Sequence, residues 1–79
     1  MKYKVKAFGI TRDVLGGREA VLDIPGQTVA ALRSALISTY PALAGLKSLM
    51  IAVNNEYAED LTELRESDEI ALIPPVSGG

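Results

Sequence analysis

One stretch of the chain, residues 28–40, has the apolar spacing of an amphipathic helix, and this limits the folds open to the sequence. Apolar side chains recur along it at helical intervals, at Val29, Leu32, Leu36 and Tyr40. Thr28 is a residue type that caps helix N-termini, and Pro41 disfavours helical geometry at the residue before it. One such helix covers one face of one sheet. We therefore expect a single α+β domain of two layers.

Strand-like segments precede this helix. Residues 2–7 alternate lysine with mostly apolar residues, which is the period of a strand with one solvated face. The alternation places Phe8 on the lysine side, so the only phenylalanine of the chain is predicted to point outward. Residues 19–24 are predicted to form a second strand, after a loop or one helical turn over residues 11–17.

Three further strand segments follow the helix. Residues 49–53 are continuously apolar, as in a buried strand, and residues 69–73 form the last strand. Asn54-Asn55 is a turn sequence that tolerates positive φ, and residues 57–58 return briefly as a strand. If the first and last strands pair in the centre of a mixed sheet, the arrangement is a β-grasp, or ubiquitin-like, fold with one main helix packed on one face. Sequence alone leaves a generic α+β roll as the alternative.

The segment 59–68 is polar and acidic apart from Leu61 and Leu64, which we expect to tuck under it as anchors. Residues 1–40 carry six Lys or Arg and three Asp or Glu, whereas residues 41–79 carry two and seven. This asymmetry argues against nucleic-acid binding and fits a basic protein partner, although a solvated acidic loop explains it equally well. The segment lacks the alternating ligands and central glycine of a calcium loop, so no metal site is predicted.

The composition excludes several kinds of catalytic chemistry. The 79 residues include no Cys and no His, which rules out disulfides, thiol nucleophiles, imidazole bases and the usual zinc sites. The longest apolar run, residues 49–53, is far shorter than the roughly 20 residues of a membrane span. We therefore expect a cytoplasmic protein that does not bind membranes, and the body of the chain does not resemble an enzyme.

The chain ends in a segment that cannot continue the final strand, consisting of Pro74, Pro75, Val76, Ser77, Gly78 and Gly79. Proline lacks the N–H that a strand ladder needs, and two in succession stiffen the exit. We expect residues 1–73 to form the domain and residues 74–79 a flexible tail that reaches about 20 Å. The two glycines can enter a channel too narrow for side chains, and ATP can activate the Gly79 carboxylate as an acyl-adenylate. A frayed terminus without function is the alternative.

The C-terminal segment resembles the signature of the small subunits of molybdopterin synthase, a family of ubiquitin-like sulfur carriers. The most specific part is residues 68–79, with the sequence DEIALIPPVSGG. Residues 4–17 resemble the family's first strand and turn, residues 28–40 its helix, and residues 51–54 its third strand and turn. The resemblance therefore covers the chain.

This resemblance implies a two-stage role in the synthesis of the molybdenum cofactor. An ATP-dependent activating enzyme adenylates the Gly79 carboxylate, which then becomes a thiocarboxylate. The tail next threads into the large subunit of molybdopterin synthase, in a heterotetramer of two small and two large subunits, and its sulfur passes to a cyclic pyranopterin. The resemblance also implies that this chain binds no cofactor, that the activating enzyme consumes the ATP, and that catalytic side chains belong to the partners.

The family also implies an exposed apolar patch that docks on both partners, which maps to Phe8, Tyr57 and Ile73. Strand alternation places Phe8 outward independently of the resemblance. It also places Ile73 on the other face of the strand from Ile70 and Leu72, which we expect to face the helix. The alternative for Phe8 is a core position on a misassigned strand. Ile73 stands where an aromatic residue is common in relatives.

Three other functions share parts of this pattern. A thiamine-pathway sulfur carrier has the same fold and Gly-Gly chemistry but usually lacks the two prolines before the tail. A ubiquitin-like modifier would join Gly79 to lysines of other proteins. A non-catalytic binding module with an inert terminus belongs to a different class of function.

Overall fold

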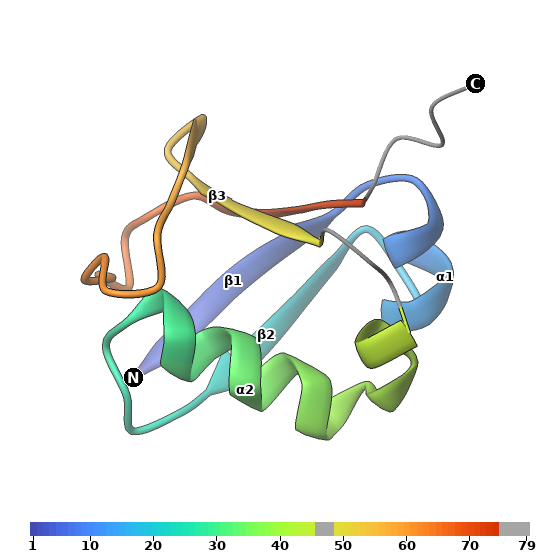
Figure 1. Ribbon diagram of the computed structural model, residues 1–79, viewed down its shortest axis with the longest axis horizontal. Helices are drawn as coiled ribbons and strands as arrows, with labels where there is room; N and C mark the ends of the chain where they lie inside the picture. Colours follow the sequence, from blue (N-terminus) through green and yellow to red (C-terminus); the bar gives the residue numbers. More distant parts are fainter. Residues whose placement is uncertain (46–48, 75–79) are drawn as a thin grey trace.

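The computed structural model describes residues 1–45 and 49–74, which form a mixed five-stranded sheet with a helix packed on one face (Figure 1). The strand order is β2-β1-β5-β3-β4. The strands are β1 (Lys2–Ala7), β2 (Glu19–Asp23), β3 (Met50–Val53), β4 (Glu56–Tyr57) and β5 (Ile70–Ile73). The central pair, β1 and β5, is parallel, and the other pairs are antiparallel. This is the predicted β-grasp arrangement, and the observed strand order excludes the generic roll.

The main helix, α2 (Val29–Thr39), begins and ends where the sequence predicts. Thr28 is its N-cap, and the Thr28 Oγ1 accepts a hydrogen bond of 3.2 Å from the Ala31 N–H. Tyr40 is the C-cap, and the short 3-10 helix η1 (Pro41–Gly45) follows it. The helical alternative for residues 11–17 is confirmed, because α1 (Ile10–Leu15) connects β1 to β2 at one end of the sheet (Figure 1).

The core lies between α2 and the inner face of the sheet. Alternate side chains of β1 and β5 point into it, as the period-2 pattern predicts. The buried side chains from these elements are Tyr3, Val5, Ala7, Ile70 and Leu72 from the strands and Val29, Leu32 and Leu36 from the helix. Burial raises the pKa of Tyr3, with a smaller contribution from nearby carboxylates, and the Tyr3 hydroxyl donates a 3.0 Å hydrogen bond to the Gly26 carbonyl.

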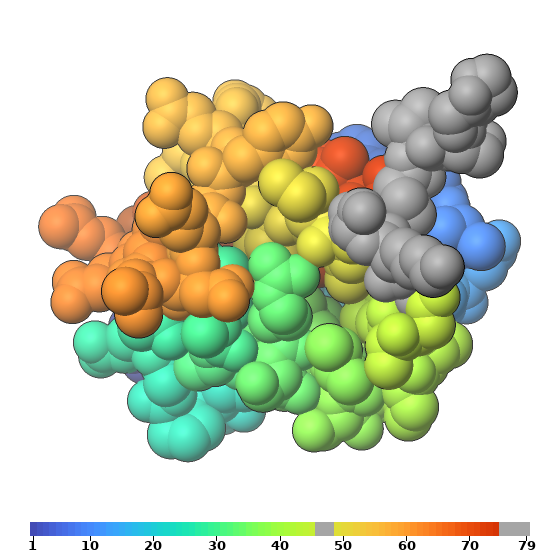
Figure 2. Space-filling model, viewed as in Figure 1, coloured from blue at the N-terminus to red at the C-terminus, as the bar shows by residue number. Residues whose placement is uncertain are grey.

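The acidic segment after β4 is held against the start of α2. The Thr62 carbonyl accepts a hydrogen bond from the Val29 N–H, and the Asp60 carbonyl accepts one from the Ala30 N–H, each 3.0 Å long. These N–H groups have no partner within the helix itself, so the segment serves as an N-terminal cap. It forms the end of the molecule opposite α1 (Figure 2).

Of the two predicted leucine anchors, one is confirmed and one is wrong. Leu64 is buried in the core, but the Leu61 side chain is 87% exposed. The reason is the cap just described: the carbonyls of Asp60 and Thr62, on either side of Leu61, are both bonded to helix N–H groups. This backbone arrangement leaves the Leu61 side chain on the solvent side.

The short turn between β3 and β4 has the predicted conformation. Asn54 and Asn55 have φ values of 52° and 69°, which asparagine adopts more readily than most residues. Within residues 1–45 and 49–74, no helix is both long enough and apolar enough to cross a bilayer. Residues 75–79 lie outside the described residues, so the predicted division into a domain and a flexible tail stays a prediction.

Candidate docking site

The face of the sheet opposite α2 carries a cluster of exposed apolar side chains near the end of β5. In the parallel pairing of β1 with β5, Ala7 lies opposite Leu72, so the next residues, Phe8 and Ile73, are neighbours. In the antiparallel pairing of β5 with β3, Met50 lies directly opposite Ile73. Phe8, Ile73 and Met50 therefore form a row that runs from the residue after β1 across β5 to β3.

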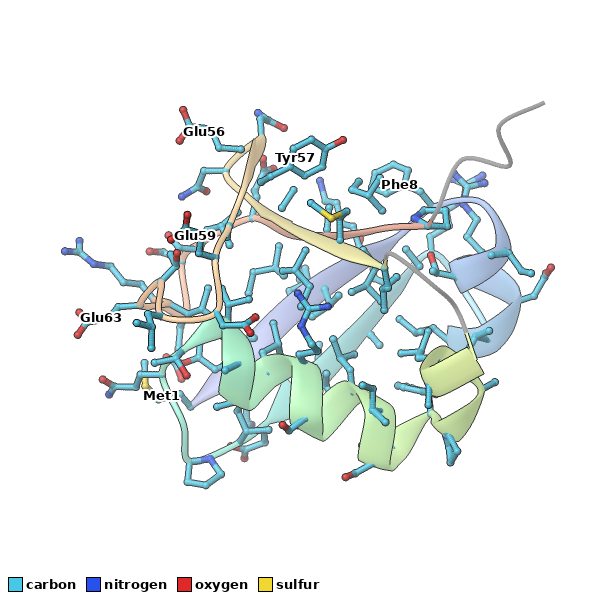
Figure 3. All side chains as sticks on the ribbon, in the orientation of Figure 1. Met1, Phe8, Glu56, Tyr57, Glu59 and Glu63 are labelled. Carbon is cyan, nitrogen blue, oxygen red and sulfur yellow. The ribbon has the colours of Figure 1, made fainter. Side chains whose placement is uncertain are left out.

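A second row runs beside the first and continues to the edge strand. The pairings align four residues across β1, β5, β3 and β4, namely Lys6, Ala71, Ala52 and Tyr57. Tyr57 and Phe8 both project from the face of the sheet opposite α2 (Figure 3). Between them lies an open hollow of about 360 Å³, whose lining includes Phe8, Tyr57 and Ile73. The small side chains of Ala52 and Ala71 form its floor.

We call Phe8, Met50, Tyr57 and Ile73 the apolar patch. The exposed fractions are 41% for Phe8, 40% for Met50 and 68% for Tyr57, and Ile73 is half-buried. The structure thus brings together the three residues that the sequence singles out and places them on the predicted face. Large apolar side chains gathered on one exposed surface are typical of a protein-interaction site.

Met50 also belongs to the patch, although the sequence alone does not indicate it. The apolar run 49–53 predicts a strand buried on both faces, and within it Leu49, Ile51 and Ala52 are indeed buried. Met50 belongs to the outer face because it pairs with Ile73. The signal that would reveal it is the register between residues 49–53 and the last strand, because residues paired across a sheet share a face.

The turn after β1 fixes Phe8 through the buried hydroxyl of Thr11. The Thr11 Oγ1 accepts a hydrogen bond of 2.8 Å from the Phe8 N–H and donates one to the Phe8 carbonyl. The Thr11 N–H also donates to the Phe8 carbonyl, at 3.1 Å. Both backbone polar groups of Phe8 are thereby satisfied, which is why the strand can end here and hold an exposed aromatic side chain in place.

Charged side chains flank the apolar patch. The Lys6 Nζ lies 3.4 Å from the Glu69 Oε1, and both side chains line the hollow. Further from the patch, Lys4 and Glu19 form a looser pair at 3.8 Å. Both pairs are largely exposed, so they contribute little to stability. The Lys6–Glu69 pair places opposite charges at the border of the apolar patch, where a partner can meet them.

The geometry of this site suits binding better than catalysis. The hollow is open and mostly apolar, with Lys6 and Glu69 as its charged members. Across residues 1–45 and 49–74, no group of three or more His, Cys, Asp or Glu side chains is arranged to hold a metal ion. Of the predicted tail, Pro74 is described and follows β5 directly, beside the patch. The predictions for Pro75, Val76, Ser77, Gly78 and Gly79 fall outside the described residues.

Comparisons with known proteins agree on one family. The model of the ThiS family matches residues 5–79. The molybdopterin synthase sulfur carrier subunit of Caenorhabditis briggsae is 42% identical, over 96% of this chain and 95% of the relative. The corresponding subunit of Chlamydomonas reinhardtii is 36% identical over the full length of both proteins.

Solved structures show the same fold. A putative molybdopterin converting factor, subunit 1, from Pyrococcus furiosus has a TM-score of 0.86 and 27% identity, over 96% of this chain and 99% of its own. SAMP1 from Haloferax volcanii has a TM-score of 0.83 and 30% identity over both whole chains. A chain in the complex of subunits 1 and 2 of the molybdopterin-converting factor from Helicobacter pylori has a TM-score of 0.68 and 28% identity, also over both whole chains. The chain therefore belongs to the ThiS family and is a homologue of the molybdopterin synthase sulfur carrier subunits.

Proposed function

We propose that this protein carries sulfur for molybdopterin synthesis as a thiocarboxylate on Gly79. The observation that carries the proposal is the position of the apolar patch beside the point where β5 ends and Pro74 begins. A partner that covers the patch is thus placed next to the root of the tail. The names of the full-length homologues support the same role.

The proposed chemistry takes place on the terminal carboxyl group. A carboxylate is a poor electrophile, so one of its oxygens first attacks the α-phosphate of ATP and pyrophosphate leaves, which gives an acyl-adenylate. Sulfide (HS⁻), as the sulfur source, then attacks the carbonyl carbon, the bond to AMP breaks and AMP leaves, and the product is a thiocarboxylate. The carrier needs no cofactor of its own, because the activating enzyme binds and consumes ATP.

We propose that the apolar patch docks in turn on the activating enzyme and on the large subunit of molybdopterin synthase. The Helicobacter pylori neighbour is itself part of a complex of subunits 1 and 2 of the molybdopterin-converting factor. The tail, from Pro74 through Pro75, Val76, Ser77 and Gly78, would enter the large subunit and present Gly79, so that sulfur passes to the cyclic pyranopterin. We expect a heterotetramer of two small and two large subunits, acting in the cytoplasm.

Intact-mass measurement tests the proposal directly. Incubation with ATP, a sulfur source and the activating enzyme should raise the mass of the chain by the difference between one sulfur and one oxygen atom. A variant that lacks Gly78 and Gly79 should keep its melting temperature but show no such increase, because the core side chains named above lie within residues 3–72. If the unmodified mass persists under every condition for the full chain, the proposal is wrong.

The likeness to SAMP1 favours a second role, as a protein modifier that is joined through Gly79 to lysines of other proteins. SAMP1 is named in two other solved structures as small archaeal modifier protein 1. Expression of an epitope-tagged chain should then yield conjugates of higher mass that disappear when Gly79 is deleted. The product of sulfur transfer distinguishes a molybdopterin carrier from a thiamine-pathway carrier. With the large subunit, the thiolated chain should yield a dithiolene.

A further inference from the structure

Two turns that are far apart in the sequence meet where β1 and β5 end. Because these strands are parallel, the residues that follow them lie at the same end of the sheet. Gly9 follows Phe8 in the turn after β1, and Pro74 follows Ile73 after β5. A Cβ atom built on Gly9 would lie 3.1 Å from the Pro74 Cγ, which is closer than an ordinary van der Waals contact.

The backbone of Gly9 also requires glycine. Its φ is 56° and its ψ is −134°, a combination that residues with a side chain rarely adopt. Gly16 provides a natural comparison, because its φ is 79° but a Cβ there would meet nothing within 4 Å. Both glycines thus have a left-handed φ, but the close approach to Pro74 belongs to Gly9.

The turn beside Pro74 is held together by several hydrogen bonds. The Thr11 hydroxyl is bonded to the N–H and to the carbonyl of Phe8, and the Gly9 carbonyl accepts a 3.1 Å hydrogen bond from the Arg12 N–H. The same turn carries Phe8 into the apolar patch. The root of the tail therefore rests on the element that positions part of the docking surface.

We propose that Gly9 is a positioning residue for the carrier tail. Its missing side chain lets Pro74 lie against the turn, so that the tail leaves the domain at a fixed place relative to the apolar patch. When a partner covers the patch, the tail then starts from a fixed point, so the carboxyl group of Gly79 samples fewer positions before it reaches the reacting atoms. This lowers the entropy cost of the reactive step. The inference rests on the proposed sulfur-carrier function.

The test compares Gly9→Ala with Gly16→Ala as substrates of the activating enzyme, with thiocarboxylate formation as the readout. Both changes place a side chain at a left-handed φ, so both lower the melting temperature. Gly9→Ala should lower kcat by about fivefold or more, because the tail is displaced. It should change KM by less than about twofold, because the hydrogen bonds from Thr11 that hold the Phe8 backbone remain. Gly16→Ala should change neither constant.

A double-mutant cycle with Pro74→Ala tests whether the fall in kcat comes from the contact between Gly9 and Pro74. Pro74→Ala does not itself place a side chain at a left-handed φ. Pro74→Ala removes the Cγ, so Gly9→Ala in that background should lower kcat by less than about twofold. The inference is overturned if Gly9→Ala lowers kcat by the same factor in both backgrounds, or by no more than Gly16→Ala does. A full chain that never gains sulfur overturns the proposed function as well, whereas normal thiolation without a Gly9 effect overturns this inference alone.

Discussion

At the scale of single residues, Asp68 shows how the acidic segment joins the sheet. The Asp68 Oδ2 accepts a 2.9 Å hydrogen bond from the Arg65 N–H, and the Oδ1 accepts one of 3.1 Å from the Asn54 Nδ2. The Asn54 Oδ1 in turn accepts a 3.0 Å hydrogen bond from the Glu69 N–H. The two bonds to the Asp68 carboxylate, first the one from the Arg65 N–H and then the one from Asn54, hold the pKa of Asp68 below its ordinary value of 3.8.

This shift predicts how stability depends on pH. Because the pKa of Asp68 is lower in the folded state than in the unfolded state, its contribution is complete above about pH 4 and is lost as the pH falls through the folded-state value. Asp68→Asn should therefore lower the free energy of unfolding at pH 7, and the difference from the original chain should shrink at about pH 3. Denaturant titrations at the two pH values measure this.

Asp13→Asn is the matched control, since Asp13 is an exposed aspartate in α1. Its free energy of unfolding should stay close to that of the original chain at both pH values. If Asp68→Asn destabilises the fold equally at pH 7 and pH 3, the carboxylate charge is not the cause.

At the scale of elements, the start of α2 depends on both sequence and tertiary structure. Its first three N–H groups are bonded to the Thr62 carbonyl, the Asp60 carbonyl and the Thr28 hydroxyl. The Thr28 cap is visible in the sequence. The other two partners are not, because no local pattern predicts that a segment about thirty residues further on returns to the helix.

Thr28→Ala removes the side-chain part of this cap and should lower the free energy of unfolding by about 1 kcal/mol. Thermal and urea unfolding give the value. Thr39→Ala, an exposed change in the last turn of α2, should be neutral or slightly stabilising, because alanine is a better helix former than threonine. Equal losses from the two changes would mean that the cap contributes nothing.

Whether information is local or long-range also decides for which strand residues the sequence predicts the face of the sheet. Alternation within one segment correctly predicts that Phe8 points outward and that Ile70 and Leu72 point inward. Met50 could not be assigned in this way, because its face depends on the register with Ile73. Turn residues such as Asn54-Asn55 are predictable because their conformation is set by the residues themselves.

At the scale of the whole molecule, the strand order was the least predictable feature. The pairing of β1 with β5 joins residues about 65 positions apart, and no local signal specifies it. The apolar patch is equally non-local, since three of its members come from β3, β4 and β5 and the fourth, Phe8, directly follows β1. The sequence indicated three of them through outward alternation and the family resemblance, but only the assembled sheet shows that they adjoin.

Because the apolar patch is exposed, we expect that a change in it can weaken docking without destabilising the fold. Phe8→Glu should weaken binding to the large subunit by about tenfold or more, because it buries a charge in an apolar contact, and should leave the melting temperature nearly unchanged. Leu61→Glu is the control: it places the same charge on an exposed leucine of the acidic segment, and that segment lies at the end of the molecule opposite α1 (Figure 2). Calorimetric titration and thermal unfolding measure the two properties.

Leu61→Glu should bind the large subunit within about twofold of the original affinity. Unaltered binding by Phe8→Glu would remove the patch from the docking surface. A large fall in its melting temperature would instead show that Phe8 supports the fold.

The parallel pairing at the centre of the sheet has a consequence for synthesis on the ribosome. Residues 2–7 are made before residues 70–73, so one edge of β1 stays unpaired until β5 has been made. Until then, a nascent chain can form the β1–β2 hairpin and α2. The edges of β1 and β3 that later pair with β5 remain open. The central pairing of the sheet thus cannot form until residues 70–73 have been joined to the chain.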